Sequence, residues 1–319
     1  MPPWVLKAGV QGAISLVPAR DRLNYALQSR ITRSVELSQA GFEEKLRRVP
    51  RHIAHYAAAT GHSEPPQSAF ELGTGWYPVV PIGLALAGVE RVVSLDIKPL
   101  ADRARVRRVL ERFVEYRDAG KLGEILPLVS EKRSALLSEG LGTDAVDAGS
   151  LLAPLGVELE LGDARATGAP GQSFDLLVSN NTLEHIPADA LDQIMGEFAR
   201  LARPGAVTDH FIDMRDHYAD FDRSMNRLNF LRYPDVFWRP FNNRLQHQNR
   251  LRLPEYREAL ESAGFTVIDE HRVKGADGEF DDLKLARRFR RFTREDALVL
   301  YVWLTGRRGP GGFRPAGAA

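Results

Sequence analysis

The sequence contains no cysteine and no long hydrophobic run. The first absence excludes disulfides, thiolate metal sites, iron–sulfur clusters and cysteine nucleophiles. The second excludes a membrane helix, because Lys7 interrupts the apolar pieces near the start and no span reaches the roughly 20 apolar residues that such a helix needs. We therefore expect a soluble, cytoplasmic protein without a membrane span.

A large excess of either charge is also lacking. The 43 Lys and Arg residues nearly balance the 42 Asp and Glu residues, which leaves a net charge of +1. The total charge therefore gives no indication of a nucleic-acid partner. With 319 residues, 44% of them hydrophobic, the chain can bury a sizeable core. We expect a helical segment at 1–66, a main domain at 67–308 and a disordered Gly/Pro-rich tail at 309–319.

The chain is organised around Phe70 to Trp76, where an apolar strand runs into Gly73 and Gly75. Two glycines one residue apart let backbone N–H groups approach a ligand, at the N-terminus of a helix expected from about Pro78 to Ala87. The third glycine of the dinucleotide pattern is missing, because Pro78 occupies its position. Alone, this turn fits either a nucleotide-type ligand or an ordinary strand-to-helix connection.

Polar residues at the ends of the next two strands favour a ligand. Asp96 follows Gly75 by 21 residues, the distance at which a βαβ unit brings a carboxylate to ribose hydroxyls. Gly162-Asp163-Ala164 follows a strand at 157–161, and a carboxylate there can accept a hydrogen bond from a purine amine. Strand ends of this kind form the ligand side of an open parallel sheet.

Further elements follow from apolar periodicity and turn residues. A fourth strand at 174–179 leads into Asn180 and the polar residues up to Pro187. We expect helices at about 41–59 with a break near Pro50, 103–116, 126–137, 188–202 closed by Arg203-Pro204-Gly205, and 254–263; strands at 207–213, 265–273 and 297–304; and insertions at about 98–155 and 215–252. The N-terminal helices either cover one edge of the core or form a lid over a substrate pocket. The segment 215–252 either lines a specific pocket or is a surface insertion.

In this order the motifs resemble those of class I S-adenosylmethionine-dependent methyltransferases. The resemblance covers about residues 68–214 and rests on Glu71-Leu72-Gly73-Thr74-Gly75, Asp96, Gly162-Asp163-Ala164, Asn180 to His185 and Arg203-Pro204-Gly205. It implies an α/β, doubly wound, mostly parallel seven-stranded sheet with a reversed last strand. It also implies S-adenosylmethionine as cofactor, held through its methionine part by Glu71, Gly73 and Gly75, through its ribose by Asp96 and through its adenine by Asp163, with Asn180 beside the methyl donor. Thr74, Ile97, Gly162 and Ala164 are expected as further cofactor-binding residues.

Catalytic candidates follow the fourth and fifth strands. His185 and His217 are candidate bases, because imidazoles titrate near neutral pH, and Asp213 is placed to orient His217. His185 alternatively braces its loop, and His210 is expected to be a packed residue of the fifth strand. A metal site made of Asp213, Asp216 and His217 is an alternative to the expected metal-free mechanism.

The acceptor is expected to be a small molecule, a sugar or a lipid-linked intermediate, methylated at oxygen. Asn180 is followed by Asn181-Thr182, so the motif that resembles base and glutamine amino-group methylation is absent. Rival functions are a nicotinamide-dependent oxidoreductase, a cofactor-binding protein without catalysis, and an RNA-binding methyltransferase that uses Arg287 to Arg291. We interpret the basic run from Lys284 to Arg291 as a solvated helix face.

Overall fold

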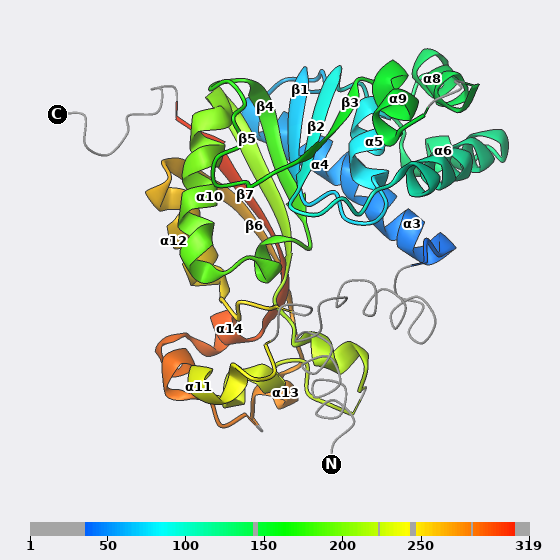
Figure 1. Cartoon of the computed structure of the whole chain (residues 1–319). Coiled ribbons are helices and arrows are strands. Elements are labelled where there is room, and N and C mark those ends of the chain that lie inside the picture. The colour runs from blue at the N-terminus through cyan, green and yellow to red at the C-terminus, as the bar shows by residue number, and fades with distance from the viewer. Residues whose placement is uncertain (1–35, 143–145, 223, 243–246, 282, 310–319) are drawn as a thin grey trace.

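The strand before the glycine turn lies in the middle of a seven-stranded sheet. In the computed structural model, which describes residues 36–142, 146–222, 224–242, 247–281 and 283–309, the strand order is β3-β2-β1-β4-β5-β7-β6 (Figure 1). The strands are β1 (Ser68–Leu72), β2 (Arg91–Asp96), β3 (Val157–Leu161), β4 (Phe174–Asn180), β5 (Ala202–Asp213), β6 (Phe265–Lys274) and β7 (Val299–Arg308).

The reversed last strand is confirmed. Neighbouring strands are parallel except at β7, which is antiparallel to both β5 and β6. Lys274, the last residue of β6, pairs with Val299, the first of β7. The residues between them therefore stay at one end of the sheet instead of crossing a face, and β7 must run back beside β6.

The strand order changes direction between β1 and β4. The chain builds outward from β1 through β2 and β3, and then returns to place β4 on the other side of β1. Leu72 pairs with Ser179, so Gly73 and Asn180 leave the sheet next to each other. Open α/β sheets bind ligands in the crevice at such a switch point. The topology thus brings the first and fourth polar strand ends together.

One face of the sheet is covered by the helices that precede β3. They share a hydrophobic cluster with Ala69, Val92 and Val157, and the segment 98–155 contributes much of it. All eight residues of α5 are buried, as expected for a helix that is apolar on every side. The elements are α3 (Gln39–Leu46), α4 (Arg48–Thr60), α5 (Val79–Leu86), α6 (Arg103–Asp118), α7 (Leu122–Ile125), α8 (Glu131–Gly142), α9 (Ala148–Leu152) and η2 (Ala153–Leu155).

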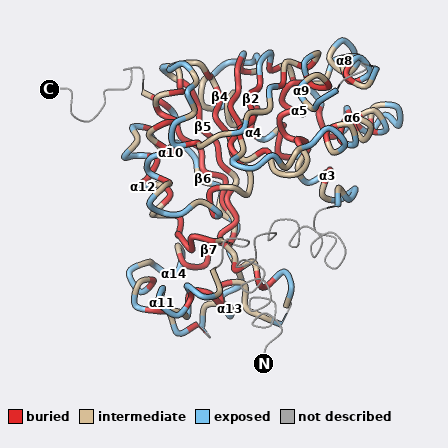
Figure 2. The backbone as a smooth tube through the Cα atoms, viewed as in Figure 1, coloured by how far each residue is buried: buried red, intermediate tan, exposed pale blue. Residues whose placement is uncertain are grey.

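The opposite face packs against two helices of the C-terminal half. These are α10 (Ala188–Leu201) and α12 (Leu253–Ser262), which cover Phe70, Leu177 and Val302. Buried residues accordingly run along the sheet between the two helical layers (Figure 2). The doubly wound α/β architecture is confirmed.

Several boundaries differ from the expected ones, and four of them have a local explanation or a clear new position. The N-terminal helix breaks at Arg47 rather than near Pro50, because Pro50 lies in the first turn of α4, where a missing N–H costs no hydrogen bond. The helix expected from residue 126 starts at Glu131, since Leu126 precedes a proline and adopts a non-helical conformation. β5 already begins at Ala202, and β7 only at Val299 because residues 294–297 form a helical turn.

A small lobe lies beyond the end of the sheet where β5 stops and β7 starts (Figure 1). We use this name for the described residues within 215–242 and 275–298. It has its own core, in which Phe230, Trp238 and Phe289 are buried. Its elements are η4 (His217–Asp220), η5 (Asn229–Arg232), α11 (Asp235–Trp238), α13 (Asp277–Asp281), η6 (Arg287–Arg291) and α14 (Arg294–Ala297). The described residues of 215–242 are thus part of a packed unit, and those of 275–298 form its other half.

A fully buried arginine joins this lobe to the sheet. The guanidinium of Arg252 donates to the carbonyl oxygens of Met214 at 2.7 Å, Ala297 at 2.9 Å and Val299. A buried cation is tolerated only with such partners. Arg252 therefore fixes the point where the chain leaves β5 against the point where it enters β7.

Candidate active site

The glycine turn after β1 is shaped by two positive backbone angles. Gly73 has φ +93° and Gly75 has φ +64°, which residues with a β-carbon rarely adopt. A β-carbon at Gly73 would lie 2.2 Å from Oγ1 of Thr182, in the loop after β4, whereas one at Gly75 would meet nothing within 4 Å. Gly73 thus permits close packing inside the crevice, and Gly75 leaves open space beside its backbone.

Asp96 holds this turn from the end of β2. Its Oδ2 accepts a hydrogen bond from the backbone N–H of Gly75 at 2.9 Å, and its Oδ1 accepts one from the N–H of Lys98 at 3.0 Å. Each carboxylate oxygen has two lone pairs, so both can still accept from a ribose diol. A pocket of about 250 Å³ opens beside Asp96, and its lining includes Thr74, Leu100 and Leu161. Ile97 is 73% exposed at the same edge.

Glu71 lies beneath the turn and not at its surface. Its buried carboxyl accepts a hydrogen bond of 2.6 Å from Ser94 Oγ, which lies 2.7 Å from Thr74 Oγ1. Burial raises the pKa of Glu71 to about 7, although the hydrogen bond from Ser94 and the charge of Lys45 oppose the rise. In this arrangement Glu71 and Thr74 brace the turn through Ser94.

The Gly162-Asp163-Ala164 turn is tied to the same edge. The Gly162 N–H donates to the carbonyl oxygen of Asp96 at 3.0 Å. The Asp163 carboxylate is half-exposed and binds the Arg165 guanidinium, whose hydrogen bonds lower the pKa of Asp163 to about 2. Asp163 is therefore a charged acceptor two residues beyond Leu161, which lines the pocket, and one side of it is already occupied by Arg165.

Asn180 ends β4 within a buried histidine–carboxylate network. Its Oδ1 lies 3.2 Å from Nε2 of His52, and the Nδ1 of His52 lies 2.7 Å from Oδ2 of Asp209. The Nδ2 of Asn180 is buried and has no hydrogen-bond partner among the described residues. An unpaired buried donor at the crevice fits a site that awaits a ligand. The side chain of Asn180 is thus oriented from below by His52.

The N-terminal segment supplies residues that sequence reasoning missed. α4 lies against β5, where His55 Nδ1 contacts both carboxylate oxygens of Asp209 at 3.0 Å and Thr305 Oγ1 donates to Asp209 at 2.8 Å. The described part of this segment packs on a sheet face through α3 and α4, and residues 1–35 lie outside the described ranges. His52 gives no signal in the sequence, because its partner Asp209 is 157 positions away.

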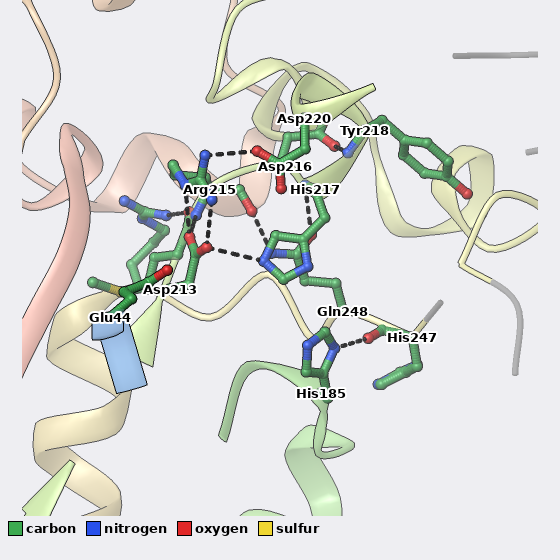
Figure 3. Close-up of polar contacts among 12 residues, drawn as sticks. Glu44, His185, Asp213, Arg215, Asp216, His217, Tyr218, Asp220, His247 and Gln248 are labelled. Carbon is green, nitrogen blue, oxygen red and sulfur yellow. Dashed lines mark hydrogen bonds and ion pairs between the residues drawn. The ribbon is translucent and has the colours of Figure 1, made fainter. Parts of the chain in front are cut away.

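A second polar cluster lies where β5 ends (Figure 3). The Asp213 carboxylate binds the Arg215 guanidinium at 2.7 Å, and its Oδ2 lies 3.4 Å from Nε2 of His217. His185, in η3 (Leu183–His185) after β4, faces His217 with ring centroids 5.1 Å apart. The three candidate catalytic residues are therefore neighbours.

Glu184 is a further member that the sequence analysis did not single out. It is 1% exposed, and neither carboxylate oxygen makes a hydrogen bond of normal geometry with the described residues. One ligand atom each of Glu184, His185 and His217 lie within 4.8 Å of one another. Its position directly before His185 is the only sequence signal that could have identified it.

Burial and nearby charges set the protonation states of this cluster. Burial raises the pKa of Glu184 to about 8, although the charge of His217 opposes the rise. Burial also lowers the pKa of His217, but the contact and charge of Asp213, together with Glu184, outweigh it and raise that pKa above its ordinary value. Desolvation and the charge of His217 lower the pKa of His185 to about 4, although the residue as a whole remains exposed. Near neutral pH His185 is therefore uncharged.

The structure bears on two expectations about neighbouring residues, Asp216 and His210. Asp216 does not belong to the cluster, because its carboxylate accepts from the N–H of Tyr218 at 3.0 Å and from Asn229 at 3.5 Å. Among the described residues, the atoms that converge as possible metal ligands belong to Glu184, His185 and His217 and not to the alternative set with Asp216. His210 is packed as expected, since it is buried between Ser179 at 2.8 Å and Thr208 at 2.7 Å.

Residues 247–249 fasten this cluster together. The Nδ1 of His185 donates to the His247 carbonyl oxygen at 2.8 Å, and the His217 N–H donates to Gln248 Oε1 at 3.3 Å. The amide of Asn249 donates to the carbonyl oxygens of Leu183 and Ile186 at 2.8 and 2.9 Å. Residues 247–249 therefore link η3 to η4.

The basic run lies away from this cluster and is not a helix of the expected kind. Residues 287–291 form the short 3₁₀ helix η6, in which Arg288 binds Asp235 at 3.0 Å and Arg291 binds Glu255 at 2.7 Å. These ion pairs use part of the positive charge that an RNA patch would need. None of the helices in the described ranges is long and apolar enough to cross a bilayer.

Comparison with known proteins gives a family match over most of the chain. The family described as a methyltransferase domain matches residues 42–270. Among solved structures, the chain is similar to a candidate methyltransferase from Bacillus halodurans (14% identity, 81% of this chain and 98% of that chain, TM-score 0.42). It is also similar to a candidate sarcosine dimethylglycine methyltransferase from Galdieria sulphuraria (14%, 82% and 86%, 0.46) and to a SAM-dependent methyltransferase from Methanosarcina mazei (16%, 78% and 95%, 0.43). No curated protein matches.

Proposed function

Since this chain belongs to the methyltransferase-domain family and is therefore an S-adenosylmethionine-dependent methyltransferase, we propose that it methylates an oxygen of a small molecule, a sugar or a lipid-linked intermediate. When bound, the cofactor supplies a methyl group on a positively charged sulfur. The observation that carries the proposal is the position of the Asp213–His217 pair. It lies at the same edge of the sheet as Asn180, where a donor at the switch point would meet an acceptor.

The donor half of the proposed site is the crevice between β1 and β4. The residues fit the cofactor, because Gly75 leaves its backbone open and Asn180 has a buried amide nitrogen without a described partner. Gly73 and Gly75 would hold the methionine part, and Asn180 would lie beside the methyl donor. Glu71 and Thr74 support the turn through Ser94.

The nucleoside part is assigned to the ends of β2 and β3. Asp96 and Ile97 would hold the ribose, because the Asp96 carboxylate borders the pocket and has free lone pairs. Gly162, Asp163 and Ala164 would lie along the adenine.

The acceptor half is assigned to Asp213, His217 and His185. The acceptor hydroxyl would lie against His217, whose imidazole takes up the proton, and the Asp213 carboxylate stabilises the imidazolium that forms. His185 would border the acceptor on the other side of His217. An acid–base pair of this kind serves a hydroxyl, whose proton must leave during methyl transfer.

Two measurements test this function. In isothermal titration of the full chain we expect saturable binding of S-adenosylmethionine and none of NADH. With a cofactor labelled in the methyl group, label is expected to reach hydroxyl compounds but not the same compounds with the hydroxyl blocked. Binding of NADH without any response to S-adenosylmethionine would contradict the proposal. Equal labelling of the blocked compounds would contradict the choice of oxygen.

A further inference from the structure

Glu184 presents a problem that a histidine–aspartate base does not explain. Proton removal by His217 needs only Asp213 as its partner, yet a carboxyl that is 1% exposed lies beside the two histidines without a normal hydrogen bond to the described residues. The backbone N–H groups of Glu184 and Asp213 and the charge of His217 offset only part of the cost of burying this carboxyl, because its pKa is still raised to about 8. Buried carboxylates are usually retained where they bind a charge.

The geometry points to a cation as the missing partner. We propose that Glu184, His185 and His217 bind a divalent first-row transition cation at the acceptor side of the methyl-transfer site. Two imidazole nitrogens and one carboxylate oxygen favour ions such as Zn²⁺, Fe²⁺ or Co²⁺, whereas Mg²⁺ and Ca²⁺ prefer oxygen ligands alone. Three protein ligands leave an open position, as in metal sites that bind a substrate.

The distances are compatible with such an ion after a small adjustment. Ligand atoms at about 2.1 Å from a tetrahedral ion are about 3.4 Å apart. The three ligand atoms here lie within 4.8 Å of one another, so a movement of about 1 Å closes the site. His185 and His217 can supply it by side-chain rotation, because His185 is exposed and His217 is only partly buried.

The surrounding hydrogen bonds suit ligation. The Nδ1 of His185 donates to the His247 carbonyl oxygen, which fixes the tautomer with a lone pair on Nε2. Asp213 contacts His217 at 3.4 Å, in the place of the carboxylate that commonly orients a metal-bound histidine. Residues 247–249 hold η3 and η4 together, so the ligands from both segments are positioned before an ion binds.

The role of the cation in the reaction rests on the proposed function, because the ion would act on the acceptor hydroxyl. With the ion bound, a hydroxyl acceptor could occupy the open position, where coordination lowers the pKa of the hydroxyl. The hydroxyl proton would then pass to water, because His217 would be held on the ion; the acid–base role assigned to His217 above applies to the site without the ion. Cation binding itself does not depend on the identity of the acceptor.

Co²⁺ is the probe for this proposal, because its visible spectrum reports tetrahedral nitrogen and oxygen ligands. The full chain, freed of metal by a chelator, is titrated with Co²⁺ and then with Zn²⁺ as competitor. We expect one equivalent to bind, with at least about tenfold weaker binding in Glu184→Gln and His185→Asn. His62→Ala is the matched control, since His62 is exposed and lies outside the cluster, and it should bind as the wild type does.

The same samples are titrated with S-adenosylmethionine to separate the two proposals. Retained cofactor binding shows that a variant is folded. Equal Co²⁺ binding by wild type and Glu184→Gln, or no binding by either, would overturn the cation site while the proposed function stands. Cofactor binding that fails while Co²⁺ still binds would overturn the proposed function and leave the cation site.

Discussion

Gly73 packs against Thr182, so the turn after β1 and the loop after β4 meet in direct contact. A β-carbon at position 73 would lie 2.2 Å from Thr182 Oγ1 and 2.7 Å from its Cγ2. The crevice therefore has one wall whose shape depends on the absence of a single methyl group.

Gly73→Ala should therefore be more harmful than Gly75→Ala. Both substitutions put a residue with a β-carbon at positive φ, at a cost of about 1–3 kcal/mol, and crowding against Thr182 adds about as much again at position 73. Urea unfolding of the two variants measures the difference. The double variant Gly73→Ala/Thr182→Gly should regain the stability lost through crowding against Thr182, but not the stability lost through the positive φ. Equal stabilities of Gly73→Ala and Gly75→Ala would show that the loop containing Thr182 moves enough to relieve the contact.

Asp96→Asn should weaken cofactor binding while the fold remains intact. The amide keeps the shape of the carboxylate but loses its charge and one acceptor, and hydrogen bonds to charged groups contribute about 1.5–3 kcal/mol each. We expect S-adenosylmethionine affinity to fall about 10- to 100-fold in isothermal titration. Glu158→Ala, which removes an exposed carboxylate from the neighbouring β3, should bind the cofactor normally. An unchanged affinity in Asp96→Asn would show that the ribose lies elsewhere.

His217→Ala should lower turnover far more than cofactor affinity. Loss of a positioned acid–base group typically costs about 10²- to 10⁴-fold in rate. S-adenosylmethionine affinity should change little, because His217 lies in η4, after β5, and outside the donor turn. Steady-state kinetics with an accepted hydroxyl compound, next to the exposed-histidine variant His62→Ala, checks this prediction. Wild-type turnover in His217→Ala would show that His217 takes no part in the reaction.

Stability should fall as the pH rises through the titration of His55. The hydrogen bond with Asp209 raises the pKa of His55 above its ordinary value; burial opposes the rise, the charge of Asp269 adds to it, and Arg51 opposes it. The pKa of a histidine in the unfolded chain is about 6.5, and below that pH the raised pKa of His55 contributes its full stabilisation. This contribution is lost as the pH rises through the pKa of His55 in the folded protein.

Urea unfolding between pH 5.5 and 8.5 measures this effect. His55→Gln should lose less stability across the range than the wild type, whereas His62→Gln should follow the wild type. The same slope in His55→Gln would assign the pH dependence to another group.

The sequence predicted those parts of the fold that depend on local pattern. The seven strands and the polar strand ends at Gly73, Asp96 and Asn180 follow from periodicity and from fixed spacings within βαβ units, whereas the reversed β7 was implied by the family resemblance. The boundary near Pro50 was wrong because a proline is tolerated in the first turn of a helix, where Pro50 lies. The boundary at Leu126 was wrong because the residue before a proline is disfavoured in a helix.

Contacts between distant segments could not be predicted in this way. His52 and Asp209 are separated by 157 positions, and the small lobe joins residues near Trp238 to residues near Phe289. No spacing rule connects such pairs, because the sheet topology brings them together. Glu184 was missed for a related reason: its importance lies in having no ordinary partner, which only the packed structure reveals.

The separate core of the small lobe has a consequence for how related enzymes can diverge. Its buried residues, such as Phe230, Trp238 and Phe289, are not shared with the two clusters that flank the sheet. Mutations there can reshape the lobe without disturbing the turn between Gly73 and Asp96. Natural selection could thus change what is methylated while the machinery that binds the methyl donor is inherited intact.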